Sequence, residues 1–196
     1  MKRAFDFGVA LGGLVMLSPL LAAAAGLVKL SSPGPAIYRG VRVGRYGRTF
    51  EILKLRTMVW GADTQGPAVT SAADARITPV GRFLRRTKFD EVPQLVNVLR
   101  GEMSLVGPRP EHPEFVKHYS DDQRKVLSVR PGVTSPAALA YMSEEQTLVG
   151  DDPAAEYMTT IMPHKLALDL DYVRTATFAG DLRIIGRTLA RVIVRR

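Results

Sequence analysis

The chain has 196 residues, 46% of them apolar, so it can form one domain with a hydrophobic core and is too apolar to be disordered throughout. Its formal net charge of +8 at pH 7 favours an acidic partner, which by charge alone is nucleic acid, anionic lipid or a phosphorylated molecule. The absence of cysteine excludes disulfides and thiolate metal sites, and the three histidines lack the close spacing of metal ligands.

The first feature along the chain is an apolar stretch from Ala4 to Val28 whose only charged residue is Asp6. As one straight helix it would be roughly 37 Å long, enough to cross a hydrocarbon core of about 30 Å. Ser18 and Pro19 interrupt it, because a proline removes a backbone donor and clashes with the carbonyl four residues earlier. The halves on either side would reach only about 21 Å and 14 Å, so neither crosses alone.

The flanking charges indicate how this stretch sits in a membrane. Basic residues precede it at positions 2 and 3, and residues 29–48 that follow contain five more. Because positive residues favour the cytoplasmic side, a re-entrant hairpin bent at Ser18 and Pro19 satisfies both ends, whereas a single span satisfies one. The residues favour the hairpin, although prolines are tolerated in spanning helices. A cleaved signal peptide, suggested by an A-x-A pattern in residues 22–25, is a weaker alternative.

Residues 31–35, SSPGP, cannot continue a helix and predict the exit from the membrane. Residues 36–58 then predict two short strands joined by a turn at Gly44 to Gly47. The hairpin is strongly basic. Lys54 and Arg56 near its end are equally compatible with a solvated surface and with the binding of phosphate groups.

Residues 60–78 are mostly small and polar and predict a loop, after which residues 80–86 predict a short helix. Two acids of the loop, Asp63 and Asp74, are candidates for a second metal ligand, although acids in loops are usually only solvated. The short helix delivers a basic run to the segment that carries the clearest chemical signal.

That segment extends from residue 85 to residue 110 and contains a predicted helix. Its apolar residues at positions 92, 95, 96 and 99 have helical spacing. Pro93 suits the first turn of such a helix and Gly101 suits its end.

Two adjacent carboxylates, Asp90 and Glu91, would lie at the N-terminal end of this helix. There the helix dipole and the cations of Arg85, Arg86 and Lys88 favour their ionised forms. Such carboxylates can serve as a nucleophile or as a metal ligand. Taken alone, however, acids that precede a helix are more often caps or solvated charges.

The arginines around the acid pair favour a chemical role. Arginine presents a planar fork that binds phosphate in two places, and Arg85, Arg86 and Arg109 are within reach of one pocket. Pro108 and Pro110 fix the backbone on both sides of Arg109 and would aim its guanidinium. Carboxylates, arginines and a rigid turn together indicate phosphoryl transfer.

The remaining segments predict helices. Residues 113–129 have the pattern of one helix, and a second helix is expected to begin at Met162 and Pro163. In residues 181–196 an arginine recurs every four residues beside an apolar stripe. This tail is equally compatible with a helix that lies on anionic lipid and with an ordinary surface helix.

Four motifs occur in a characteristic order: KLRTM at residues 54–58, the pair Asp90 and Glu91, PRPE at residues 108–111 and RPG at residues 130–132. With them the chain resembles the bacterial sugar transferases, specifically the small monotopic phosphoglycosyl transferases, over nearly its whole length. The resemblance implies a membrane enzyme that begins a surface-glycan pathway. Such enzymes move a sugar 1-phosphate from a UDP-sugar to undecaprenyl phosphate through a covalent aspartyl intermediate and release UMP.

The resemblance also implies roles for individual residues. Asp90 would be the nucleophile and a ligand of Mg²⁺, the expected cofactor, and Glu91 would assist as the second catalytic acid. Phosphate and substrate binding would fall to six cationic residues: Lys54, Arg56, Arg85, Arg86, Arg109 and Arg130.

The expected architecture is α/β, mostly helical with a small β-hairpin. Residues 1–30 would form the re-entrant anchor, and residues 31–196 a compact catalytic domain with amphipathic interfacial helices on the cytoplasmic face of the bacterial inner membrane. Membrane lipid is an expected partner and nucleic acid is not. The donor sugar, the pathway and a homo-oligomeric state stay open.

One departure from the family pattern lies after the RPG motif. Where the family has a glycine with an aromatic neighbour, this chain has VTSPAAL, with Ser135 and Pro136 in their place. This leaves substrate identity open and keeps an inactive scaffold as one alternative. A non-catalytic protein that binds anionic ligands at the membrane is another, but it leaves the acid pair and the PRPE motif without a role.

Overall fold

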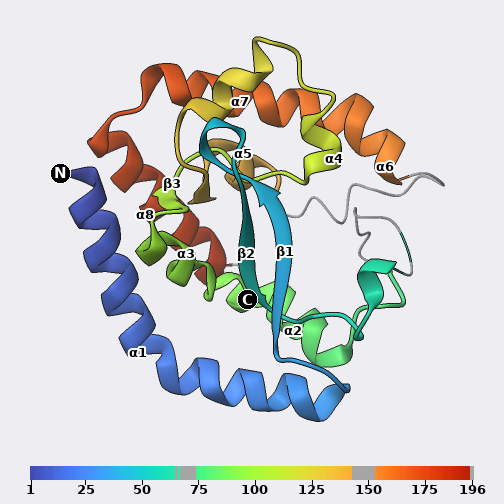
Figure 1. Ribbon diagram of the computed structural model, residues 1–196. Coiled ribbons are helices and arrows are strands. Elements are labelled where there is room, and N and C mark those ends of the chain that lie inside the picture. The colour runs from blue at the N-terminus through green and yellow to red at the C-terminus, as the bar shows by residue number, and fades with distance from the viewer. Residues whose placement is uncertain (65, 67–73, 143–152, 195–196) are drawn as a thin grey trace.

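The structure, a computed structural model, describes residues 1–64, 66, 74–142 and 153–194. Within these ranges the chain is mostly helical and contains two sheets of two strands each (Figure 1). This confirms the expected helical character and the hairpin, and adds a second small sheet that the sequence did not predict. Parts of the expected 60–78 loop, at 65 and 67–73, lie outside the described residues.

The N-terminal helix α1 (Lys2–Ser31) runs along the outside of the molecule and changes direction about midway (Figure 1). Pro19 lies inside it, so the expected interruption is a bend within one continuous helix. Pro19 has no N–H to donate to the carbonyl of Val15. The hydroxyl of Ser18 donates to that carbonyl instead, at 2.8 Å, which explains why serine and proline occur as a pair here.

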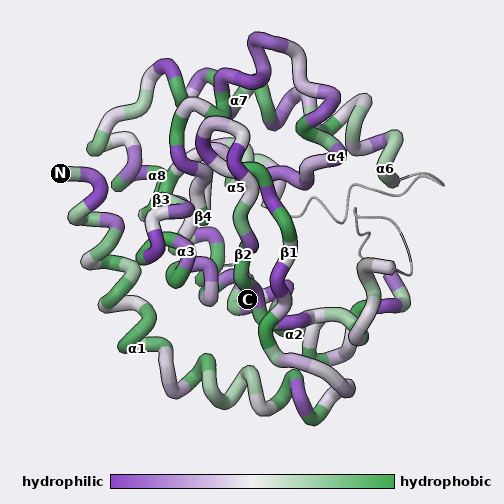
Figure 2. The backbone as a smooth tube through the Cα atoms, viewed as in Figure 1, coloured by the Kyte–Doolittle hydropathy of each residue, from purple (hydrophilic) through white to green (hydrophobic). Residues whose placement is uncertain are grey.

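The surface of α1 is apolar where it does not contact the rest of the chain. Val15, Met16 and Leu20 are 68%, 74% and 58% exposed, whereas Ala10 and Val28 are buried against the domain. Figure 2 shows hydrophobic residues along most of this helix. Within the described part of the chain, α1 is the one helix long and apolar enough to cross a membrane by length and composition.

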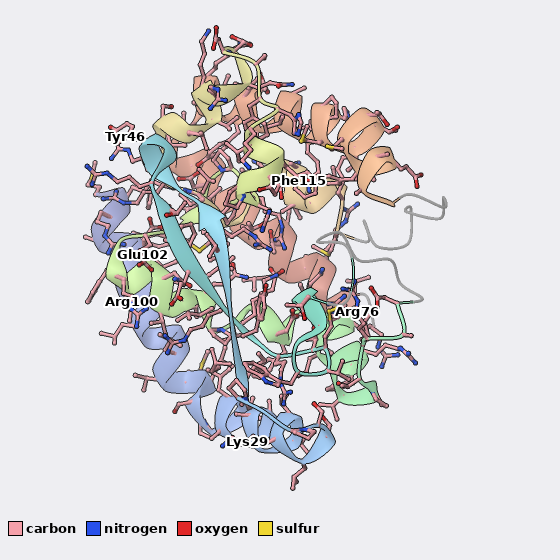
Figure 3. All side chains as sticks on the ribbon, turned by 45° about the vertical axis from the view of Figure 1, so that its right-hand side comes forward. Lys29, Tyr46, Arg76, Arg100, Glu102 and Phe115 are labelled. Atoms are coloured by element: carbon pink, nitrogen blue, oxygen red, sulfur yellow. The ribbon has the colours of Figure 1, made fainter. Side chains whose placement is uncertain are left out.

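The hairpin consists of β1 (Ile37–Val43) and β2 (Thr49–Leu55), which pair antiparallel from Ile37 opposite Leu55 to Val43 opposite Thr49. Its tight turn, η1 (Arg45–Gly47), has Tyr46 at a φ of 59° and Gly47 at a φ of 76°. The hairpin therefore confirms the predicted strands and turn. Tyr46 at its tip lies in the upper part of the molecule in Figure 3, and Lys29 near the end of α1 lies at the bottom.

The predicted helices before and after the acid pair are also confirmed. A short turn, η2 (Ala62–Thr64), lies in the preceding loop. Next come α2 (Pro79–Thr87), the single turn η3 (Phe89–Glu91) and α3 (Gln94–Arg100). Gly101 ends α3 with a φ of 81°, the left-handed conformation that glycine adopts without strain.

The second sheet joins two of the sequence motifs. Its strands β3 (Ser104–Val106) and β4 (Gly132–Thr134) pair in parallel and bring the PRPE segment beside the RPG segment. The N–H of Gly132 donates to the carbonyl of Pro108 at 2.9 Å. A Cβ at Gly132 would lie 2.1 Å from the nitrogen of Gly107, so the two backbones can approach this closely only because both residues are glycine.

The prediction of one helix over residues 113–129 is wrong. The structure has α4 (Pro113–Val116) and a separate η4 (Gln123–Ser128). Between them the N–H of Ser120 donates to the Gln123 side chain at 2.8 Å, and the N–H of Gln123 donates to the Ser120 hydroxyl at 3.3 Å. These reciprocal bonds start a new helical turn where the periodicity suggested continuity.

The C-terminal part is helical, with α5 (Pro136–Ala140), α6 (Pro153–Glu156), the π turn η6 (Tyr157–Ile161), α7 (Met162–Thr175) and α8 (Phe178–Val194). The helix expected to begin at Met162 and Pro163 is therefore preceded by helical turns from Pro153 onward. The apolar residues at helical spacing in this segment are Leu166, Leu170 and Val173; the first two are buried and Val173 is partly buried, so this face points inward.

The core consists of three clusters arranged along the hairpin and α1. One joins α7, α4 and η4 to the end of β1 through Val43. A second joins the first half of α1, α3, β3 and part of α8 to Ile52 of β2. The third joins the second half of α1 and α2 to Leu55 of β2. The acid pair lies in η3, between α2 of the third cluster and α3 of the second.

Candidate active site

The acid pair occupies a single turn whose ends are fixed by helices. Lys88, at a φ of 56°, ends α2 in a left-handed conformation and starts η3, and α3 follows at once. Asp90 is 6% exposed. In this turn the carboxylates of Asp90 and Glu91 are adjacent in sequence but contact different side chains.

Glu91 is held between two cations. Its Oε1 accepts from Lys54 Nζ at 2.9 Å and from Arg109 Nη2 at 2.8 Å, and Arg109 Nη1 lies 3.5 Å from Oε2. Burial alone would raise the pKa of Glu91, but Arg109 and Lys54 outweigh it and hold that pKa well below its ordinary value. Burial in turn lowers the pKa of Lys54, an effect that Glu91 partly offsets.

Asp90 has the opposite electrostatic situation. The pKa of Asp90 is raised to about 6. Burial is the main cause, the positive charge of Lys54 opposes it, and the negative charge of Glu91 adds to it. Its Oδ1 is buried and has no hydrogen-bond partner among the residues that the structure describes. The expectation that this environment favours the ionised form is therefore confirmed for Glu91 and wrong for Asp90, because desolvation exceeds the effect of the nearby cations.

Arg85 and Arg86 end on different sides of α2, since successive residues of an α-helix point about 100° apart. Arg85 donates from Nε to the hydroxyl of Thr57 at 2.9 Å and helps to lower the pKa of Asp90, whereas Arg86 is exposed. Thr57, in the KLRTM motif, was missed in the sequence because it is uncharged. Its position three residues after Lys54 was the signal available.

Arg56 and Arg130, both expected to bind phosphate, are not brought to the acid pair. Arg56 is 4% exposed and donates to the carbonyls of Ser32, at 2.8 Å, and Pro33. Arg130 donates from Nε to the carbonyl of Gly101 at 2.8 Å. Each guanidinium thus satisfies carbonyls at the C-terminal end of a helix, α1 and α3 respectively, where the helix dipole favours a cation.

The departure at Ser135 and Pro136 forms the start of α5. The N–H of Ala138 donates to the Ser135 hydroxyl at 2.9 Å, and Pro136 occupies the first turn. Ser135 is completely buried beside Asp169 of α7, and Oδ2 of Asp169 accepts a hydrogen bond from the N–H of Arg109. The departure is therefore connected to the PRPE turn through Asp169.

The donor set for a divalent cation is small. The described residues contain no group of three or more His, Asp or Glu side chains placed to hold a metal ion. Asp74 is paired with Arg76 at 2.6 Å, and the side chain of Asp63 lies outside the description. The unpartnered Oδ1 of Asp90 fits a Mg²⁺ ion that takes its other ligands from phosphate and water.

Chemically, the arrangement contains one buried carboxylate that ionises near neutral pH beside a second that stays anionic between cations. The turn that carries these carboxylates and the preceding helix α2 pack near α1, whose outer surface is apolar and exposed. A carboxylate of this kind beside cations suits chemistry on phosphate groups, and the exposed apolar helix suits a membrane surface.

The comparison with protein families is specific. A family model described as bacterial sugar transferase matches residues 1–195, and the chain belongs to this family.

Named relatives extend this result. The chain is 38% identical over 195 residues to the UDP-glucose:undecaprenyl-phosphate glucose-1-phosphate transferase of Caulobacter vibrioides, covering 98% of the chain and 69% of the relative. It is 38% identical to the UDP-N-acetylgalactosamine-undecaprenyl-phosphate N-acetylgalactosaminephosphotransferase of Aeromonas hydrophila, covering 98% of the chain and 43% of the relative. It is 34% identical to the exopolysaccharide production protein ExoY of Sinorhizobium fredii, covering 100% of the chain and 86% of the relative.

The protein is therefore a transferase, as these relatives are named. Equal identity to a glucose-phosphate and an N-acetylgalactosamine-phosphate transferase means that similarity does not select the donor sugar.

Proposed function

We propose that this protein transfers a sugar 1-phosphate from a UDP-sugar to undecaprenyl phosphate, with Asp90 as the nucleophile. The observation that carries the proposal is the asymmetry of the acid pair. Asp90 is buried, has an oxygen without a hydrogen-bond partner and has a pKa of about 6, while Glu91 is neutralised by Lys54 and Arg109. A desolvated carboxylate that ionises near neutral pH is suited to nucleophilic attack.

The reaction has two displacements. An oxygen of Asp90 attacks the β-phosphorus of the UDP-sugar, the bond from that phosphorus to the bridging oxygen breaks, and UMP leaves with the oxygen. A phosphate oxygen of undecaprenyl phosphate then attacks the same phosphorus and displaces the Asp90 carboxylate. The product is an undecaprenyl diphosphosugar.

The cations around the pair have a defined task in this scheme. An anionic nucleophile is repelled by a diphosphate, so positive charge at the site lowers the barrier. Lys54, Arg85 and Arg109 lie near the pair, where their positive charge would act on the phosphate oxygens of a bound donor. Arg86, exposed on α2, is available to a phosphate that arrives from the membrane side.

Magnesium is the proposed cofactor. Asp90 would hold it together with diphosphate oxygens and water, because the described residues offer no larger ligand set. When bound, the ion would neutralise charge on the diphosphate and on departing UMP.

The proposed membrane geometry is a re-entrant α1 with the domain on the cytoplasmic face of the bacterial inner membrane. Contacts at both ends of the helix support it. Near the N-terminal end, Arg3 donates to the carbonyl of Leu99 at 3.0 Å and Asp6 accepts from the Ser104 hydroxyl at 2.7 Å. At the other end Arg56 binds the carbonyls that follow the helix. Contacts of both helix ends with one domain favour a position of both ends on the same side of the bilayer.

The tail helix α8 supports a second contact with lipid. Ile184 and Ile185 pack on the core, whereas Phe178, Leu182, Leu189 and Ile193 are 45%, 43%, 58% and 65% exposed. The stripe that the sequence suggests for this tail consists of Leu182, Ile185, Leu189 and Val192. Of these, Leu182 and Leu189 lie on the exposed apolar face, whereas Ile185 faces the core. An exposed apolar face on an arginine-rich helix suits an anionic membrane surface.

The experiment that tests the proposal measures UMP release by protein in nanodiscs with Mg²⁺, undecaprenyl phosphate and a panel of UDP-sugars. Release with one donor and not with the others identifies the reaction and the sugar together. Asp90→Asn is expected to abolish release and to remain folded in the membrane. Release at more than a few per cent of the wild-type rate in that variant would exclude Asp90 as nucleophile.

A further inference from the structure

The turn that carries Arg109 has an unusual backbone. Pro108 and Pro110 have no N–H, so the N–H of Arg109 is the only backbone donor in this three-residue turn. It donates to Oδ2 of Asp169 in α7 at 3.2 Å, and the acceptor is a side chain from sixty residues further along the chain. Asp169 therefore fixes the turn at the residue whose guanidinium binds Glu91.

Asp169 is otherwise an unexpected residue at its position. It lies three residues after Leu166 on the inward face of α7 and is 4% exposed. Its Oδ1 has no hydrogen-bond partner, and burial raises its pKa to about 6 although Ser135 and two backbone N–H groups favour the charged form. Burial of an acid destabilises the folded protein unless hydrogen bonds or opposite charges compensate for it. An acid at this position is therefore a candidate for a functional role.

Other charged and titratable groups surround Asp169. They come from the PRPE turn, from the segment after α4 and from α7 itself, and are Arg109, Glu111, Tyr119, Lys165 and Tyr172. The cavity that Asp169 and Arg109 line has a volume of about 20 Å³, room for about one water molecule. Asp169 is itself 4% exposed and contacts the Arg109 backbone, which points to a role through Arg109 and not on the substrate.

We propose that Asp169 is a positioning residue for the transferase reaction: by holding the Arg109 backbone it keeps the Arg109 guanidinium on Glu91. This inference rests on the proposed function. It also connects the Ser135 and Pro136 departure to the site, because the buried Ser135 side chain interacts with Asp169.

The test compares Asp169→Asn with the matched control Asp171→Asn, an exposed position on the same helix. UMP release is measured with the active UDP-sugar. Asp169→Asn is expected to lower kcat about tenfold or more, with KM for the donor changed less than about twofold, because the Arg109 N–H then donates to a neutral amide oxygen in place of a charged carboxylate, which weakens the bond. The control is expected to match the wild type. Should Asp169→Asn not fold, Asp169→Glu takes its place with the same expectations.

A second arm separates positioning from general stability. In an Arg109→Ala background there is no guanidinium to position, so adding Asp169→Asn is expected to cause no further loss. A loss of the same factor in both backgrounds would overturn the proposal.

The ¹⁵N signals of the Arg109 guanidinium give a readout that does not need turnover. In the wild type its two Nη groups are expected to give separate signals because they are held on Glu91, whereas in Asp169→Asn these signals are expected to merge as in a free arginine; separate signals in that variant would also overturn the proposal. If the wild type releases no UMP from any UDP-sugar, the proposed function fails and the Arg109 signals alone decide the positioning role. If the wild type is active and Asp169→Asn equals the control, only the positioning role fails.

Discussion

Two adjacent carboxylates in one turn differ in their electrostatics because their partners differ. Glu91 receives hydrogen bonds from Lys54 and Arg109, while the buried Oδ1 of Asp90 receives none. The pKa of Asp90 is therefore raised to about 6 and that of Glu91 is held well below its ordinary value. The proposed attack by Asp90 requires its ionised form. Neighbouring charges that shift the Asp90 pKa should therefore shift the pH dependence of UMP release.

For the wild type, kcat/KM for UMP release should rise with pH through about 6, the pKa of Asp90. In Lys54→Met this rise should move to higher pH by about one unit, since Lys54 lowers the Asp90 pKa. Lys125→Met, an exposed lysine paired with Asp122, should leave the profile in place. A profile that is unchanged in Lys54→Met would mean that the titrating group is not Asp90.

The same burial predicts an effect on stability. Because the pKa of Asp90 is raised on folding, the folded protein binds the extra proton and loses stability as pH rises from about 4 to about 6. Asp90→Asn removes this penalty. The variant should be more stable than the wild type by about 1–3 kcal/mol at neutral pH and no more stable below about pH 4. Thermal unfolding in detergent at both pH values, with Asp171→Asn as control, measures the difference; lower stability of Asp90→Asn at neutral pH would contradict the account.

At the scale of elements, the helices and strands that the sequence predicts best are those set by local signals. Pro93 and Gly101 bracket α3, and the glycines of residues 44–47 form the hairpin turn. The parallel pair of β3 and β4 was not predicted, because each strand is only three residues long and its partner is distant in sequence. The split of residues 113–129 depends on side-chain bonds at Ser120 that periodicity does not register.

The exposed face of α8 makes a prediction at this scale. Replacing Leu189 and Ile193 with glutamine should reduce sedimentation of the protein with anionic vesicles, since these side chains are exposed and do not contribute to the core. The variants Ile184→Val and Ile185→Val, which trim the inward face, are the matched control and should bind as the wild type does. Unchanged binding of the glutamine variant would leave α8 as an ordinary surface helix.

At the scale of the whole molecule, the sequence predicts the position of some site residues and not of others. The acid pair and Arg109 are brought together as predicted from their types and from the prolines beside Arg109. Arg56 and Arg130 carry the same chemical groups, but tertiary contacts direct them to the ends of α1 and α3. Asp169 could be recognised only as an acid on an apolar helix face, because its partner lies in a different segment.

The contacts at both ends of α1 also predict its topology. The chain has no cysteine, so single cysteines at the exposed positions Ala4 and Ser31 can be labelled without background. In intact spheroplasts a membrane-impermeant maleimide should label neither, and after the membrane is opened it should label both. Labelling of one of the two from outside would establish a single span.

The central claim is that Asp90 forms a covalent bond to the β-phosphorus of the donor. The most direct test incubates the protein with Mg²⁺ and the active UDP-sugar, without undecaprenyl phosphate, and measures UMP together with the mass of the Asp90 peptide. We expect about one UMP per protein molecule and a sugar phosphate on Asp90 that disappears when undecaprenyl phosphate is added. UMP formed only when the acceptor is present, with an unmodified Asp90 peptide throughout, would contradict the account and favour direct transfer between the two substrates.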